Sequence, residues 1–330
     1  MKKLKNTQKN LDGAQMLFDL HKMNLDDIKK LSIENHKIIT VRIEEKVKIE
    51  NLTALNEVLS EKNFLVSVII ESENYNLGGM VSGINVFQYI CNVKKLKIYV
   101  SDYDARLEDL FFLKDIKSLN YLDISTNAKK NLKFDELKRF SKITYFSYLC
   151  EGLNKEQHSF VNDFMDLSYF SIYDLNLELF DTKESLIELR VHRKLTNAML
   201  IYDKFPNLEN LILEKCKSLD FKNSISNLPN IINISLRYMS DVYELPKFKN
   251  PEKIKKISLL GLNNLRSLNG IEEMQNLEEL EITNIKNINI ESFLILKKLK
   301  SLKKIYILFE NSKLNIEFED FARKNKIHLI

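Results

Sequence analysis

The feature of this sequence that most constrains its fold is a short apolar pattern that returns every 23 residues. The same spacing occurs four times in unbroken succession, in NLENLIL (207–213), NIINISL (230–236), KIKKISL (253–259) and NLEELEI (276–282). Two further apolar columns keep this step, namely Leu219, Val242, Leu265 and Ile288, and then Ile225, Phe248, Ile271 and Leu294. Three apolar columns at one period indicate a repeat protein, in which each unit packs mainly on its neighbours.

The centre of each unit has the pattern of a short β-strand. In NLENLILEKCKSL the gaps between apolar residues are three, two, three and three, at Leu208, Leu211, Leu213, Cys216 and Leu219. The alternation from Leu211 to Leu213 is typical of a strand, and the flanking gaps indicate turns. Because a strand this short cannot bury itself, we expect one strand per unit in a parallel sheet.

Looser copies extend the array in both directions and predict twelve units. Their central apolar residues are Val41, Val68, Leu96, Leu122, Phe146, Phe170, Leu189, Leu211, Ile234, Ile257, Leu280 and Ile305. The step before Leu189 is the shortest, and the others span 22–28 residues. Residues 36–100 contain several apolar runs, so the first three units allow more than one phase.

The pattern resembles the leucine-rich repeat, L-x-x-L-x-L-x-x-N/C-x-x-L, over most of the chain. YLDISTN (121–127) and NLENLILEKC (207–216) carry the family's ladder residue as Asn127 and Cys216. Other units depart from the family pattern at this position, with Leu175, Met239, Leu262, Ile285 or Glu151. The resemblance implies an α/β leucine-rich-repeat solenoid, a curved horseshoe with a parallel β-sheet on its concave face, similar to intracellular members of bacterial or phage type.

The length of each unit predicts its outer face and the division of the chain. Units of 24–28 residues leave room for helices, expected at 104–118 and 131–141, whereas later units of 22–23 residues leave room for 3₁₀ turns or extended segments. We expect capping helices at 11–23 and 318–325 and a loose segment over residues 1–10. KIHLI (326–330) is a candidate truncated strand. The predicted domains are a tail with a capping helix (1–35), the solenoid (36–310) and a C-terminal cap (311–330).

Composition excludes several classes of function. The 330 residues carry a net charge of only +4, which argues against a positive electrostatic field that would attract nucleic acid. They include only 7 glycines, which argues against an enzyme with a phosphate-binding loop. The three cysteines are odd in number and widely spaced, as is typical of a reducing compartment. The N-terminus lacks an apolar signal region, and no segment approaches 18 uninterrupted apolar residues. We therefore expect a soluble, unexported, cytoplasmic protein without membrane or nucleic-acid partners.

The titratable residues form no recognisable catalytic or metal site. Cys150 with His158 could form a thiol nucleophile, but the sequence shows no orienting group, and Cys216 is predicted to be structural. The five histidines, His21, His36, His158, His192 and His328, lack the companion spacing of metal ligands. LKKLKSLKK (296–304) is predicted to be solvated lysines, and the acids of DYDAR and LDDIKK fit helix N-termini. No catalytic residue, cofactor or metal is therefore predicted.

The strand phase predicts which side chains face the concave side. The position before each centre holds Thr40, Ser67, Lys95, Tyr121, Tyr145, Tyr169, Glu188, Asn210, Asn233, Lys256, Glu279 and Lys304. Three tyrosines in adjacent units form a ladder, which could merely stabilise neighbouring strands by about 0.2–1 kcal/mol per pair. Tyr and Arg also concentrate binding energy in interfaces. The predicted partner-binding residues are Tyr99, Tyr121, Tyr145, Tyr169, Tyr173, Arg190, His192, Arg193, Arg237 and Tyr238.

These observations favour a non-enzymatic protein that recognises another protein through the concave face and is monomeric when free. The resemblance, together with a Lys-, Asn- and Ile-rich composition of bacterial or phage character, suggests an immunity or inhibitor protein that neutralises a toxin or an enzyme. One alternative is an adaptor or regulatory subunit resembling the phosphatase-regulating leucine-rich repeat proteins. A second alternative, of another class, is an effector with an unrecognised activity in residues 1–100.

Overall fold

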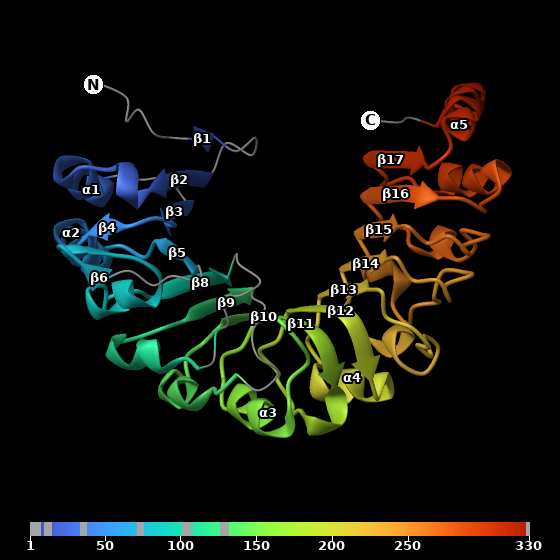
Figure 1. Ribbon diagram of the computed structural model, residues 1–330. Coiled ribbons are helices and arrows are strands. Elements are labelled where there is room, and N and C mark those ends of the chain that lie inside the picture. The colour runs from blue at the N-terminus through green and yellow to red at the C-terminus, as the bar shows by residue number, and fades with distance from the viewer. Residues whose placement is uncertain are drawn as a thin grey trace. The chain divides into compact units, whose positions relative to one another are not determined.

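The computed structural model describes residues 8–9, 15–33, 38–70, 76–100, 107, 109–125 and 132–327. The chain divides into two compact units, Met1–Leu167 and Ser168–Ile330. In each unit most strands lie side by side in one main sheet, and helices and turns lie on one side of that sheet (Figure 1). We call the other side of the sheet the open face.

The first unit is built on parallel strands, apart from a short antiparallel strand at its N-terminal edge. Its sheet follows the order β1 (Gln8–Lys9), β2 (Gln15–Asp19), β3 (Ile38–Ile43), β5 (Leu65–Ile70), β8 (Lys95–Val100), β9 (Tyr121–Ser125) and β10 (Tyr145–Leu149). Only β1 runs antiparallel to its neighbour among these described pairs. A small separate sheet contains β4 (Val47–Lys48), β7 (Met80–Val81) and β6 (Asn76–Leu77).

Short helices join the strands of the first unit. They are η1 (Leu20–Lys22), α1 (Leu25–Lys30), η2 (Leu31–Ile33), α2 (Ile49–Glu61), η3 (Gly83–Gln88), η4 (Phe111–Asp115), η5 (Asp135–Arg139) and α3 (Lys155–Asn162), where η denotes a 3₁₀ helix. Asn154 caps α3 with a capping box, because its side chain accepts from the N–H of Gln157 and the Gln157 side chain accepts from the N–H of Asn154.

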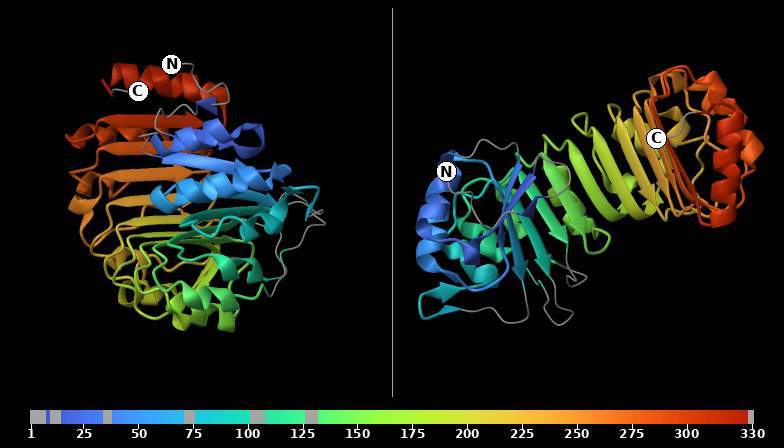
Figure 2. Two further views of the ribbon diagram at one scale, coloured as in Figure 1. Left: turned by 90° about the vertical axis from the view of Figure 1, so that its left-hand side faces the viewer. Right: turned by 90° about the horizontal axis from the view of Figure 1, so that it is seen from above.

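The second unit repeats one parallel strand per turn of the chain (Figure 2). Its strands are β11 (Tyr169–Asn176), β12 (Glu188–Thr196), β13 (Asn210–Glu214), β14 (Asn233–Arg237), β15 (Lys256–Leu260), β16 (Glu279–Ile285) and β17 (Lys304–Phe309). The connecting helices are η6 (Leu177–Leu179), η7 (Ala198–Leu200), α4 (Ile201–Lys204), η8 (Ile225–Asn227), η9 (Pro251–Lys253), η10 (Ile271–Glu273) and η11 (Ile290–Lys298), followed by α5 (Ser312–Lys324).

The central apolar residues of successive units are in register and form the core. Leu211, Ile234, Ile257, Leu280 and Ile305 pair in turn across β13–β17, and each is at most 7% exposed. In the first unit the same column continues through Leu96, Leu122 and Phe146. One parallel strand per repeat, with a shared apolar column, makes the chain an α/β leucine-rich-repeat solenoid, as the sequence predicts.

The early part of the array differs from the prediction in phase and in its first element. Val41 pairs with Val66 rather than Val68, so the predicted phase of that unit was wrong by two residues. Residues 15–19 form strand β2 instead of a capping helix, with Phe18 buried and paired with Val41. Hydrogen bonds to the edge of β3 decide this segment, and a sequence pattern does not contain that information. Residues 11–14 and the predicted loose segment 1–7 lie outside the described residues.

The two outer helices predicted in the first unit are shorter and tighter than expected. Within 104–118 the structure describes η4, and within 131–141 it describes η5; residues 104–106, 108 and 131 lie outside the described part. The N–H of Leu113 donates to Leu110 O and the N–H of Ile116 donates to Leu113 O, and all three side chains are buried. A spacing of three fits a 3₁₀ turn as well as an α-helix, and the short turn suffices to bury these side chains.

The later outer segments and the C-terminal cap follow the prediction more closely. The units around η8, η9 and η10 use short 3₁₀ turns. Helix α5 includes most of the predicted closing helix and lies against β17, where Phe318 packs on Phe293 and Phe309. Residues 328–330 of the candidate truncated strand lie outside the described residues, and the predicted domain limits stay a prediction.

Candidate functional site

The open face of the second unit consists of side chains that alternate with the buried core along each strand. Three columns cross it in register. The first column contains Glu188, Asn210, Asn233, Lys256, Glu279 and Lys304, and the second contains Ser171, Arg190, Ile212, Ser235, Ser258, Glu281 and Tyr306. The third column contains Glu214, Arg237, Leu260, Thr283 and Leu308.

Three of the predicted tyrosines lie on the first unit. Tyr121 and Tyr145 begin β9 and β10 in register, and their rings are stacked with centroids 3.8 Å apart and planes 11° apart. Tyr99, near the end of β8, pairs with Ser125 and is 45% exposed. The predicted position of Ser67 in the column of Thr40 was wrong, because Leu65 is the register partner of Thr40. The first unit thus presents a stacked aromatic pair and one more exposed tyrosine.

In the second unit, two predicted arginines lie over predicted tyrosines and are already paired with carboxylates. The Arg190 guanidinium is 5.1 Å from the Tyr169 ring centroid, and its Nε donates to Glu188 Oε1 at 2.7 Å. Arg193 forms a bidentate ion pair with Asp174, in which Nε donates to Oδ1 at 2.9 Å and a terminal nitrogen donates to Oδ2 at 2.5 Å. Its guanidinium lies 5.6 Å from the Tyr173 ring centroid. These internal partners fix both cations against the face.

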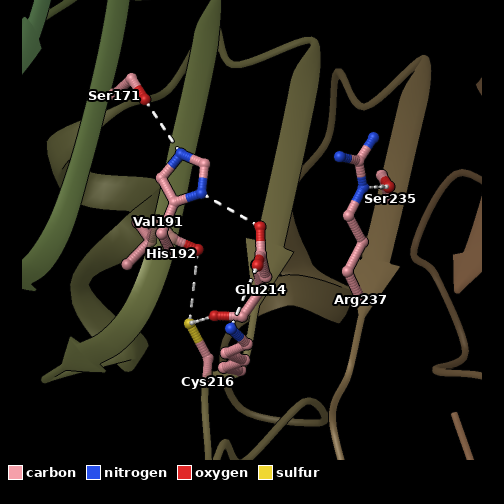
Figure 3. A network of polar contacts seen from close by, with 8 residues as sticks. Ser171, Val191, His192, Glu214, Cys216, Ser235 and Arg237 are labelled. Atoms are coloured by element: carbon pink, nitrogen blue, oxygen red, sulfur yellow. Dashed lines mark hydrogen bonds and ion pairs between the residues drawn. The ribbon is translucent and has the colours of Figure 1, made fainter. Parts of the chain in front are cut away.

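His192 is the centre of a polar network on β11, β12 and β13 (Figure 3). Its Nε2 is 3.1 Å from Ser171 Oγ, and its Nδ1 is 3.2 Å from Glu214 Oε2. The residue order resembles a Ser-His-acid triad, but Ser171 is only 2% exposed, so its oxygen is closed to a substrate carbonyl. The network therefore fixes the orientation of the His192 ring, which also meets Tyr173 edge to face.

Arg237 differs from the other two predicted arginines because no carboxylate of a described residue pairs with it. Its Nε donates to Ser235 Oγ at 2.9 Å, and the side chain is half-buried. Its register neighbours are Glu214 and Leu260. The Glu214 carboxylate is directed to His192 instead, with Lys215 Nζ 3.8 Å from its other oxygen (Figure 3).

Tyr238 follows Arg237 in a left-handed backbone conformation, with φ of 51°. The equivalent residues Lys215, Gly261 and Asn284 share this conformation. The N–H of Tyr238 donates to Leu260 O at 2.7 Å. The ring lies against Gly261, where an added Cβ would be 2.5 Å from Tyr238 Cδ1, and the residue stays 46% exposed. The backbone and Gly261 therefore hold an exposed aromatic ring in one place.

The side chains of the first column form hydrogen bonds and ion pairs with one another. Asn233 donates to Asn210, and Glu279 accepts from Lys304 at 2.7 Å and pairs with Lys256 at 2.9 Å. The hydrogen bonds from Lys304 and Lys256 lower the pKa of Glu279 to about 2. Both lysines of this ladder are therefore held by one carboxylate within the face.

The candidate thiol site and the ladder cysteine have the environments of structural groups. Burial lowers the pKa of His158 to about 4, so it is neutral near pH 7 and supplies no positive charge to a thiolate at Cys150. Burial raises the pKa of Cys216 to about 12, and its Sγ contacts the carbonyl oxygens of Val191 and Glu214. Among the residues that the structure describes, no three acidic, histidine or cysteine side chains gather as metal ligands. Several residues considered in the sequence lie outside the described part of the chain, namely Asn127, His36, His328 and the acids of DYDAR.

The apolar residues of the third column are not among the residues predicted from the sequence. Leu260 is half-buried, Leu308 is 40% exposed, and Tyr306 in the adjacent column is 50% exposed. Stepping from Arg237 by the repeat spacing reaches Leu260, Thr283 and then Leu308. The repeat spacing could therefore have identified this column, which contains no tyrosine.

Comparison with known proteins gives no family assignment. No family model matches the chain, and a search of curated proteins finds no match. Among solved structures, an internalin from Listeria monocytogenes matches with 13% sequence identity and a TM-score of 0.40, over 90% of this chain and 82% of that chain. The fold assignment therefore rests on the strand register and repeats of this chain itself. Within the described residues, no helix combines the length and apolar character needed to cross a membrane.

Proposed function

We propose that this chain is a non-enzymatic recognition protein that binds another protein on the open face of its sheet. The observation that carries the proposal is the stacked pair Tyr121 and Tyr145, half-buried and side by side on the open face of the first unit. Stacked tyrosines present a large, rigid area with polar tips, so they lose little side-chain freedom when a partner covers them. The second unit adds Tyr169, which Arg190 orients.

The biological role proposed for this surface is inhibition, in which the chain acts as an immunity protein that covers a toxin or enzyme. A sheet of repeats supplies extended area rather than an enclosed pocket, which suits occlusion of a protein surface. An adaptor would bind the same way but leave its partner active. We also propose that the free protein is a cytoplasmic monomer, which cell fractionation and light scattering test.

The test starts with affinity capture of the partner from the source cell, followed by titration of the purified partner. Tyr145→Ala and Tyr169→Ala are each expected to weaken binding by more than about 1 kcal/mol, roughly fivefold, while circular dichroism stays unchanged. Tyr202→Ala, which removes a more exposed tyrosine of helix α4, is the control. Unchanged binding by both face variants removes the proposal. Loss of the partner's activity on binding supports the inhibitor role, and retained activity supports the adaptor.

A further inference from the structure

We propose that Arg237 and Tyr238 form a receptor for a carboxylate side chain of the protein partner, and that the neighbouring leucines bind apolar residues next to that acid. The inference rests on the proposed function, because it assigns chemistry to a protein bound at the same face. It goes beyond that function by naming where the partner's negative charge sits.

The first step is the state of the Arg237 guanidinium. An arginine side chain offers five N–H donors, and Ser235 takes the one on Nε. The two terminal nitrogens form no ion pair with a described residue, although the side chain is half-buried. Glu214, its neighbour on β13, gives its carboxylate to His192. The carboxylate of this register neighbour is therefore engaged by His192, and a carboxylate from outside can form the two parallel hydrogen bonds that the guanidinium favours.

The second step is the rigidity of Tyr238. Its position is set by a left-handed backbone, by the hydrogen bond to Leu260 O, and by the absence of a Cβ at Gly261. Lys215 Nζ lies 6.0 Å from the ring centroid. An aromatic ring that is already fixed and exposed gains binding area without loss of rotamer freedom. The cation of Arg237 and the ring of Tyr238 thus form a site in place before a partner arrives.

The third step is the apolar surface beside this site. Leu260, Thr283 and Leu308 continue the column of Arg237 across β15–β17, and we call these three residues the leucine row. At about 4.8 Å per strand, the distance from Arg237 to Leu308 is roughly 14 Å. Tyr306, in the next column, is 50% exposed beside this row. A segment that fits must carry an acid at one end and apolar residues over the following 14 Å or so.

Charge on the rest of the face favours an acidic protein segment over a nucleic acid. Nucleic-acid binding needs several unpaired cations along a phosphate track. Here Lys256 and Lys304 share the carboxylate of Glu279, and Glu281 adds a second negative charge beside the leucine row, so these four side chains carry no net charge. A single unpaired guanidinium next to apolar side chains matches one carboxylate.

The probe for this inference is a displayed library of random twelve-residue peptides, panned on the full chain with counter-selection on Arg237→Gln. We expect the surviving peptides to share an Asp or Glu with apolar residues on one side of it. Arg237→Gln should weaken a selected peptide at least tenfold, because a charge-assisted contact contributes more than about 1.4 kcal/mol. Arg237→Lys, which keeps the charge but not the fork, should weaken it less. Arg323→Gln, which removes an exposed arginine of helix α5 that is already paired with Asp320, is the matched control.

A second set of measurements makes the assignment specific. Changing the shared acid of the peptide to its amide should weaken binding to the wild type and have no further effect on Arg237→Gln. Recovery of no such peptides, or equal binding to Arg237→Gln and wild type with unchanged circular dichroism, would overturn the proposal. A twenty-nucleotide oligothymidylate is tested in parallel at physiological salt. Oligothymidylate binding that depends on Arg237 would overturn the proposal in favour of a nucleic-acid ligand. Failure here leaves the Tyr145 and Tyr169 titrations with the captured partner unaffected, so the two proposals fail separately.

Discussion

The rings of Tyr121 and Tyr145 are stacked at 3.8 Å between centroids on neighbouring strands of the first unit. The contact has two consequences, because the same pair stabilises the sheet and offers a flat aromatic surface. Aromatic pairs contribute about 0.5–1.5 kcal/mol beyond the area they bury. Substitutions in the stack therefore have two separate readouts, the free energy of unfolding and the affinity for a partner.

We predict that Tyr121→Ala and Tyr145→Ala each lower the free energy of unfolding by about 1 kcal/mol without loss of the fold. In a double-mutant cycle measured by urea denaturation, the two changes should be coupled by about 0.5–1.5 kcal/mol. Additive effects of the two substitutions would mean that the stacked geometry does not stabilise the sheet.

Gly261→Ala is predicted to be more destabilising than Gly78→Ala. Both glycines have φ of 64°, so both substitutions carry the cost of a left-handed alanine, about 1 kcal/mol. Only at Gly261 does the new Cβ meet a side chain, the ring of Tyr238. Urea denaturation should show the excess cost, and adding Tyr238→Ala should remove it. If the double variant stays as unstable as Gly261→Ala, the ring contact is not the cause.

Cys216 is predicted to be unreactive towards thiol reagents in the folded protein. The residue is completely buried, and its burial raises the thiol pKa to about 12, so almost no thiolate exists at pH 8. Timed labelling with an aromatic disulfide reagent and peptide mapping should modify Cys216 only after denaturation. Cys91 and Cys150, which are partly exposed, are the internal comparison. Rapid labelling of Cys216 in native buffer would contradict the assigned core position.

Acid is predicted to weaken the ladder formed by Lys256, Glu279 and Lys304. Hydrogen bonds from Lys304 and Lys256 lower the pKa of Glu279 in the folded protein from its ordinary 4.5 to about 2. A lowered pKa stabilises the folded state above pH 4.5, and this contribution is lost as the pH falls towards 2. Because the side chain is partly exposed and screened by solvent, we expect less than about 1 kcal/mol.

The measurement for Glu279 is the free energy of unfolding of wild type and Glu279→Gln from pH 6 to pH 2.5. The difference between them should shrink as the solution becomes acidic, and at high salt it should be small throughout. Glu273→Gln, which changes an exposed acid without an ion pair to any described residue, is the control. A difference that grows on acidification has the wrong sign for this assignment.

The later part of the fold was predictable because its core repeats without interruption. Leu211, Ile234, Ile257 and Leu280 recur at one spacing, and the structure puts them in register as that spacing requires. Near the N-terminus, Val66 and Val68 are both apolar and both buried, so the sequence offers two equivalent phases. Pairing with Val41 selects the first of them through hydrogen bonds between strands. Strand β2 escaped prediction for the same reason.

The candidate site was predictable only as a set of side chains on one face. The strand phase places Arg190, Arg193 and Arg237 there, but it does not show which of them already has an acidic partner. That difference depends on side-chain positions, since Glu188 and Asp174 reach their arginines while Glu214 is held by His192. The leucine row was not predicted because the candidate residues were selected mainly as tyrosines and arginines, and this row contains neither.

Binding of a protein by the open face is measured by titrating the captured partner against Tyr145→Ala and Tyr169→Ala. We expect a roughly fivefold or greater loss of affinity for each variant, with the fold intact and Tyr202→Ala unchanged. Wild-type affinity in both face variants would contradict the proposal.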